Sequence, residues 1–413
     1  MQVRLPPGAL YFPMSVKTQN LVRTTWPGWC GLGALLVSSW FLHQGSVELN
    51  LQAAILIGVL FVAMFCVEAF LCLRGNFGLI GAALKRKVDT GRIFFKIAGL
   101  IITIACLSSA YWIFPEYYDD FYKPYFQALA STWPYLAAFF IFCIVWEDPR
   151  SDEHEDANYW IAKAFFYINL KSLKNINLKQ HILGWLIKIY FLPLMFVYLV
   201  NYNCFSFNFD GVFGTYNTLY NIIFFIDTAF VCVGYIFANN LIDTHIRSSE
   251  PTMLGWVCTL ICYEPFWTTI GSSYLTYGSN WGSWLVGHPH LQIFWACLIV
   301  LCLILYVWAT ISFGSRFSNL THRGILVCGP YAYLRHPAYI GKLSSFFLMY
   351  VPFIGHNFIT IIRNCILWSL LVGVYYLRAK TEEAHLRSVG PEYDIYTKEV
   401  EENWRKLVRW ESR

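Results

Sequence analysis

Two short polar stretches near the end of the chain combine residue types that bind charged ligands. The first, from Gly329 to Gly341, has the sequence G-P-Y-A-Y-L-R-H-P-A-Y-I-G, and the second, from Arg378 to Glu383, has the sequence R-A-K-T-E-E. Arginine and histidine can hold a carboxylate, glutamates can accept hydrogen bonds from an ammonium group or hydroxyls, and tyrosine rings can lie against a cation. These two stretches form the densest cluster in the chain of residues that could bind a ligand or take part in chemistry.

The two stretches lie on either side of an apolar run that is interrupted by G-H-N at residues 355–357. Such a run predicts a helical hairpin, whose two membrane crossings return the chain to the side that it left. Both polar stretches would then meet on one face of the membrane. Within the first stretch, Gly329, Pro330 and Pro337 favour a tight turn where the backbone can approach a ligand.

The composition indicates that lipid covers most of this chain. Of its 413 residues, 57% are hydrophobic and only 13% are charged, whereas soluble domains average about a quarter charged. Continuous apolar runs exclude a β-barrel, whose strands must alternate. We therefore expect an all-α polytopic membrane protein with about ten transmembrane helices, near residues 26–43, 52–73, 93–114, 125–146, 180–200, 217–238, 253–271, 290–313, 340–354 and 358–377.

The positions of the basic residues predict the orientation of these helices. With ten crossings, all of the 30 Lys and Arg residues except Lys123 and Arg363 fall on the side of the N-terminus. Because cytoplasmic loops carry the excess of positive charge, both termini should be cytoplasmic. The membrane would be the inner membrane of a bacterium or the endoplasmic reticulum of a eukaryote.

The ordered set of motifs at the end of the chain resembles the isoprenylcysteine carboxyl methyltransferase superfamily, which includes the phospholipid N-methyltransferases. The shared elements are G-P-Y, R-H-P-x-Y followed by glycine, a hairpin, R-x-x-x-E-E, and G-x-x-Y-x-x-Y, within residues 316–400. The resemblance implies a methyltransferase region at 291–413, preceded by a transmembrane region of unknown role at 1–290. It also implies S-adenosylmethionine as the methyl donor.

The resemblance and the residue chemistry together suggest which side chains would act. Arg378, at the end of the last crossing, would bind an anionic group of the acceptor, and Arg378 and Glu382 are the candidate catalytic residues. The residues expected to bind the donor are polar, aromatic or turn-forming, namely Gly329, Tyr331, Arg335, His336, Pro337, Tyr339, Glu382 and Glu383.

Three carboxylates fall within predicted membrane segments, where ionisable groups are costly and tend to be functional. They are Glu68, Asp227 and Glu264, of which we expect Asp227 and Glu264 to line the acceptor cavity. The acceptor should be amphipathic, a lipid or lipid-linked, because its tail could enter sideways from the bilayer. A carboxylate acceptor would need no base, whereas an amine would need a nearby Glu or His to take its proton; the sequence leaves both open.

Other functions fit less well. A reductase similar to the sterol reductases, with a nicotinamide cofactor, shares a related C-terminal hairpin, but such enzymes tend to carry R-D-E where this chain has R-x-x-x-E-E. A transporter would be expected to show inverted repeats, and none is evident. The net charge of +5 is too small to suggest nucleic acid, and the 13 cysteines, which form no C-x-x-C pair, predict neither a disulfide framework nor a metal site.

Overall fold

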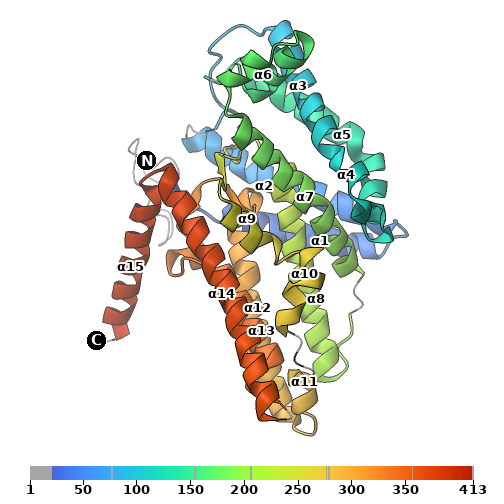
Figure 1. Ribbon diagram of the computed structural model, residues 1–413, viewed down its shortest axis with the longest axis vertical. Helices are drawn as coiled ribbons and strands as arrows, with labels where there is room; N and C mark the ends of the chain where they lie inside the picture. Colours follow the sequence, from blue (N-terminus) through green and yellow to red (C-terminus); the bar gives the residue numbers. More distant parts are fainter. Residues whose placement is uncertain are drawn as a thin grey trace, which may run out of the picture.

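The computed structural model describes residues 21–75, 78–152, 155–204, 207–275, 277, 280–355 and 357–411, so parts of the predicted N-terminal arm and the central residue of the G-H-N break lie outside the described residues. The described chain is almost entirely helical (Figure 1). Its strands are two residues long and form two small ladders. Strand β1 (Leu21–Val22) pairs in parallel with β4 (Ile325–Leu326), and β2 (Ser248–Ser249) pairs antiparallel with β3 (Thr321–His322).

Seven helical segments of the described chain are long and apolar enough to cross a bilayer, which supports a multi-pass membrane protein. They correspond to seven of the ten predicted segments. These are α2 (Leu49–Gly75), α3 (Thr90–Ser108) continued by α4 (Ala110–Ile113), α5 (Lys123–Glu147), α7 (Leu178–Asn203), α8 (Gly211–Ile236), α12 (Pro289–Phe313) and α14 (Phe358–Val389).

The other three predicted segments are not among these seven, although α1 has the predicted bounds, so the count of ten crossings stays a prediction. Helix α1 (Trp26–His43) has 18 residues, and α13 (Pro337–Tyr350) has 14. The segment 253–271 is not one helix: α9 (Met253–Leu260) ends, and α10 (Phe266–Thr269) starts after Pro265. Proline lacks the N–H that a continuing helix needs, and eight residues span only about 12 Å.

The remaining elements are short or peripheral. They are the helices α6 (Ala157–Phe166), α11 (Trp281–Trp284) and α15 (Glu392–Glu411), and the 3₁₀ turns η2 (Pro115–Tyr118), η3 (Asp120–Tyr122), η4 (Leu170–Asn175), η5 (Gly271–Leu275), η6 (Gly314–Arg316) and η7 (Gly329–Ala332). Helix α15 projects from the end of α14, while α3, α5 and α6 gather at the other side of the molecule (Figure 1).

The core lies around α8, which is the most buried of the seven long helices, whereas few side chains of α3 and α5 are buried, as is typical of lipid-facing helices. Small residues allow the close packing on which the C-terminal region depends. A side chain at Gly341 of α13 would come within 2.7 Å of the Cys302 carbonyl oxygen on α12. Helix α13 therefore lies tightly against α12.

Two groups of buried charges outside the polar stretches are paired. Arg316 forms an ion pair with Glu68 of α2, so this intramembrane glutamate is neutralised. Asp148, which is fully buried, accepts hydrogen bonds from Arg92 (2.6 and 2.7 Å) and lies 3.1 Å from the Lys96 ammonium. Burial raises the pKa of Asp148, but these hydrogen bonds outweigh it and hold the pKa below its ordinary value.

Replacing Asp148 by Asn should therefore destabilise the protein. The change removes the buried carboxylate that Arg92 and Lys96 share and leaves them only the more exposed Asp89 and Asp156. Removing one partner of a fully buried pair costs about 3–5 kcal/mol, which is the upper bound expected here. The measurement is the free energy of unfolding in detergent at neutral pH. Asp152→Asn is the matched control, because the Asp152 side chain is 89% exposed; equal effects of the two changes would contradict the prediction.

The ion pairs of Asp148 also predict how the stability of the fold depends on pH. A carboxyl group whose pKa is lowered on folding stabilises the fold fully above its unfolded-state pKa of about 3.9. This stabilisation is lost as the pH falls below that value toward the lowered pKa of the folded state. Unfolding measured between pH 7 and pH 3 should show a shallower loss of stability in Asp148→Asn than in the unaltered protein.

Candidate functional site

The start of α13 and the end of α14 lie side by side, and this contact brings the two polar stretches together. His336 Nε2 lies 3.1 Å from Glu383 Oε1, and the Tyr339 hydroxyl donates to Glu382 Oε2 at 2.9 Å. Further along, the rings of Phe347 and Trp368 are in contact, with centroids 5.4 Å apart. The two helices therefore run in opposite directions.

The local structure around the first stretch is a tight turn followed by a helix start. Gly329 has φ +62°, a conformation that favours glycine, and a side chain there would meet the Ser312 hydroxyl at 2.7 Å. Pro337 occupies the first turn of α13, where its missing N–H costs nothing. The Tyr396 hydroxyl of α15 donates to the Tyr331 carbonyl oxygen at 3.0 Å. These contacts shape the turn; neither Gly329 nor Pro337 lines the cavity described next.

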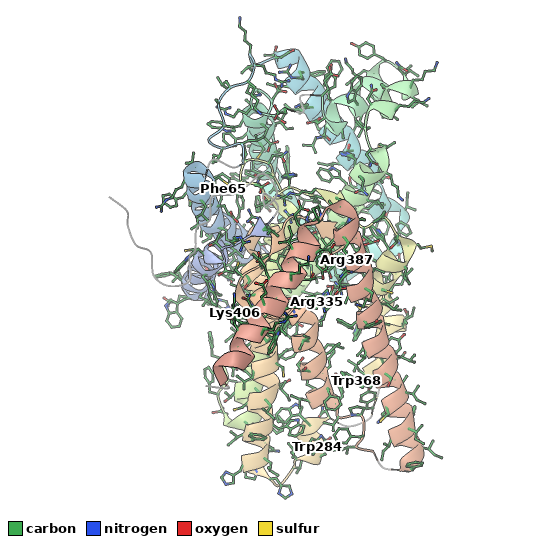
Figure 2. All side chains as sticks on the ribbon, turned by 90° about the vertical axis from the view of Figure 1, so that its left-hand side faces the viewer. Phe65, Trp284, Arg335, Trp368, Arg387 and Lys406 are labelled. Carbon is green, nitrogen blue, oxygen red and sulfur yellow. The ribbon has the colours of Figure 1, made fainter. Side chains whose placement is uncertain are left out.

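A cavity of about 110 Å³ lies between the two polar stretches. Six of the residues predicted to act line it, namely Tyr331, Arg335, His336, Tyr339, Arg378 and Glu382. Figure 2 shows Arg335 and Arg387 on the side of the molecule where α14 meets α15, far from Trp284 at the other end of the bundle. The site therefore lies where α13 begins and α14 ends, away from α11.

Arg378 is a buried cation without an anionic partner. Its exposed fraction is 7%, and its guanidinium donates to the amide oxygen of Asn319 at 2.7 Å. The rings of Tyr339 and Tyr263 lie 5.0 and 5.7 Å from the guanidinium carbon. No carboxylate pairs with Arg378 among the residues that the structure describes. Because an unpaired buried charge is costly, this arrangement favours a ligand that carries an anionic group.

The two adjacent glutamates have different environments. Glu383 is buried, with Arg335, Lys380 and Arg387 at 3.4–3.6 Å from its oxygens in addition to His336. It does not line the cavity and joins α13 to α14. The side chain of Glu382 is 45% exposed and lines the cavity. Glu382 is therefore the carboxylate that a bound ligand can reach.

The other predicted acidic residues lie outside the cavity. Asp227, buried in α8, accepts hydrogen bonds from the Tyr306 and Thr310 hydroxyls, both at 2.6 Å. It reaches the cavity only through Tyr306, which lines it. The Glu264 carboxylate accepts from the backbone N–H and the hydroxyl of Thr268 at 3.1 and 2.6 Å. The structure does not bring Glu264 to the cavity.

Several cavity residues had not been predicted. Lys342 and His385 carry a sequence signal, because they follow Tyr339 and Glu382 by three positions and so share the same helix faces. The others come from segments that are distant in the sequence, and no residue spacing indicates that these segments approach the hairpin. They are Glu250, Tyr263, Tyr306 and Asn319.

Comparison with protein-family models, curated proteins and solved structures finds nothing that matches this chain. Within the described ranges, no group of three or more His, Cys, Asp or Glu side chains could hold a metal ion. The ionisable and aromatic groups that line the cavity are those of Arg378, Glu382, Lys342, the basic pair at 335–336, Glu250, His385 and the tyrosines.

The two glutamates provide a test of this geometry. Glu383→Gln should destabilise the protein by about 2 kcal/mol, because charge-assisted hydrogen bonds to His336 and the surrounding basic side chains are weakened. Glu382→Gln removes a carboxylate that has only the Tyr339 hydroxyl as a hydrogen-bond partner among the described residues, so the change in stability should be much smaller. Thermal unfolding in detergent distinguishes them; the reverse order would contradict the roles assigned here.

Proposed function

We propose that this chain is an integral membrane methyltransferase that uses S-adenosylmethionine and acts on an amphipathic, lipid or lipid-linked acceptor. The observation that carries the proposal is the cavity in which the unpaired Arg378 guanidinium, the accessible Glu382 carboxylate and tyrosine rings face one another. Opposite charges at the two sides of an aromatic cavity suit a donor that is itself charged at several atoms.

The residues present fit the chemical groups of S-adenosylmethionine. Arg335, His336 and Arg378 offer donors for its carboxylate, and Glu382 offers oxygens for its ammonium group or ribose hydroxyls. The rings of Tyr339 and Tyr375, whose centroids are 5.6 Å apart in an edge-to-face arrangement, offer π-electrons to a cation. When bound, the donor supplies a methyl group that its positive sulfur activates toward a nucleophile.

The surroundings of the cavity support an acceptor with an apolar tail. Large apolar side chains of α13 and α14 close to the cavity residues are exposed, including Ile340 (43%), Tyr376 (60%) and Leu377 (42%). In a bilayer these side chains would meet lipid, and a tail could lie against them while the head enters the cavity. We further propose that α13 and α14 form a membrane hairpin and that the cavity opens toward the cytoplasm, as the basic residues predict.

In this proposal the protein contributes mainly position. The Tyr339 hydroxyl fixes the orientation of Glu382, and Asn319 fixes that of Arg378. Side chains with fixed orientations hold the donor and the acceptor in position, so that less entropy has to be lost when the two react. Arg378 remains available for one anionic group, either the carboxylate of the donor or a group of the acceptor.

The test is calorimetric binding of S-adenosylmethionine to the detergent-purified protein. Arg378→Ala and Glu382→Gln should each weaken binding roughly tenfold to a hundredfold, because each removes a charge-assisted hydrogen bond. Arg363→Ala is the matched control, because Arg363 lies on the same helix about 22 Å from Arg378 along its axis; its affinity should equal that of the unaltered protein.

NADPH is titrated in parallel. Saturable binding of NADPH without binding of S-adenosylmethionine would refute the methyltransferase proposal and favour the sterol-reductase-like alternative. Binding of S-adenosylmethionine that neither Arg378→Ala nor Glu382→Gln weakens would place the donor elsewhere in the molecule.

A further inference from the structure

The side chains of Glu250, His385 and Ser248 form a row that has no part in the binding roles proposed above. His385 Nε2 lies 2.9 Å from the Ser248 hydroxyl oxygen, and His385 Nδ1 lies 3.6 Å from Glu250 Oε2. The imidazole thus lies between a hydroxyl and a carboxylate. Ser248 and Glu250 belong to the segment of β2, more than 130 residues before His385 on α14, so only the tertiary structure places them together.

The carboxylate of this group is buried and held in one orientation. Glu250 is 2% exposed, and its Oε1 accepts hydrogen bonds from the backbone N–H (2.9 Å) and the hydroxyl of Thr252. Its backbone is fixed as well, because the Trp256 indole donates to the Glu250 carbonyl oxygen and the Glu250 N–H donates to Leu320. The second oxygen, Oε2, is the one that faces His385.

This row of side chains runs from the cavity outward. Glu250 and His385 both line the cavity, whereas Ser248 does not line it and is partly exposed. Opposite Ser248 in the β2–β3 ladder lies His322, and neither of its ring nitrogens has a hydrogen-bond partner among the described residues. Residues directly opposite in a ladder share one face, so His322 is next to Ser248.

We propose that Glu250, His385 and Ser248 form a proton relay that removes a proton from the acceptor during methyl transfer; this inference rests on the proposed function. The nucleophile's bond to the methyl carbon forms while the carbon–sulfur bond breaks, and the electron pair of that bond stays on sulfur. The proton of the nucleophile passes to Glu250. His385 then takes that proton at Nδ1 and gives its Nε2 proton to the Ser248 oxygen, while the hydroxyl proton of Ser248, which is partly exposed, passes to solvent.

The relay identifies the class of the acceptor. A carboxylate acceptor carries no proton at neutral pH and needs no base, so a buried His–Glu pair beside it would have no use. An amine or a hydroxyl must lose a proton as it is methylated. The acceptor is therefore an amphiphile whose nucleophile bears N–H or O–H, and not a fatty or isoprenyl carboxylate.

The position of Ser248 argues against a role as the nucleophile of a Ser–His–Glu triad. Such a serine must face the substrate, and Ser248 lies outside the cavity on the far side of the imidazole. The ionisable groups that face His385 are Glu250 and His322 from the two strands and Glu382 on its own helix. The proton-accepting members nearest the cavity are thus carboxylates.

The test compares Glu250→Gln, His385→Phe and Ser248→Ala with the unaltered protein, and uses His288→Phe, an exposed histidine at the far end of α12, as the matched control. Radiolabelled S-adenosylmethionine is supplied with vesicles that contain dioleoylphosphatidylethanolamine, oleyl alcohol or oleate. Transfer to the amine or to the alcohol should occur and should fall roughly 10²–10⁴-fold in the first two variants. The Kd for S-adenosylmethionine should stay within about twofold, and Ser248→Ala should show an intermediate rate.

A second readout does not depend on turnover. In the unaltered protein, infrared spectroscopy during a pH titration should show the C=O stretch of a buried carboxylic acid that is absent in Glu250→Gln. The titration midpoint of this band should shift in His385→Phe and Ser248→Ala but not in His288→Phe. A midpoint unaffected by the loss of His385 would overturn the relay, whatever the rates are.

The other outcomes are also decisive. Transfer to oleate only, no transfer to the amine or the alcohol while S-adenosylmethionine binds, or full rates in Glu250→Gln and His385→Phe would each overturn the relay and leave the proposed function standing. Labelling of Ser248 by a fluorophosphonate would replace the relay with a nucleophilic serine. Failure of the unaltered protein to bind S-adenosylmethionine would instead count against the proposed function itself.

Discussion

The ion cluster around Glu383 is the contact on which the candidate site depends. One buried carboxylate lies within 3.6 Å of nitrogen atoms from Arg335, His336, Lys380 and Arg387, and these side chains come from the start of α13 and the end of α14. The attraction of these cationic neighbours offsets the cost of taking the carboxylate out of water. The cluster holds two helix ends together and thereby forms one side of the cavity beside it.

Charges elsewhere in the described chain show why Arg378 differs. Arg316 is neutralised by Glu68, and the Asp148 carboxylate by two basic side chains. In an apolar environment each unpaired charge costs several kcal/mol, so pairing is the rule. Arg378 has an amide oxygen and two tyrosine rings instead. Arg323 is likewise buried without a carboxylate, but backbone carbonyl oxygens accept hydrogen bonds from it, whereas Arg378 lines the cavity.

The cavity and the group behind it divide the chemistry between them. In the proposed mechanism, Arg378 and Glu382 on the side facing the hairpin would bind the ligand, and Glu250 and His385 on the side facing the β2–β3 ladder would move the proton. Methyl transfer to a proton-bearing nucleophile needs both binding and proton removal. For binding, it is enough that the side chains hold the donor and the acceptor in position. The packed helices α12, α13 and α14 place this polar junction where α13 begins and α14 ends.

By itself the sequence determined the all-helical membrane character and which C-terminal residues would gather, because apolar runs and motif spacing are local properties. It could even have indicated Lys342 and His385, which follow predicted residues by one helical turn. Only the tertiary structure decided that Glu382 faces the cavity while Glu383 joins the helices, and that Asp227 and Glu264 bond to neighbouring hydroxyls outside it. Only the tertiary structure brings Asn319, Tyr263 and Glu250 to the site. The approach of these distant segments depends on packing around α8 and α12, and no periodic pattern in the sequence indicates it.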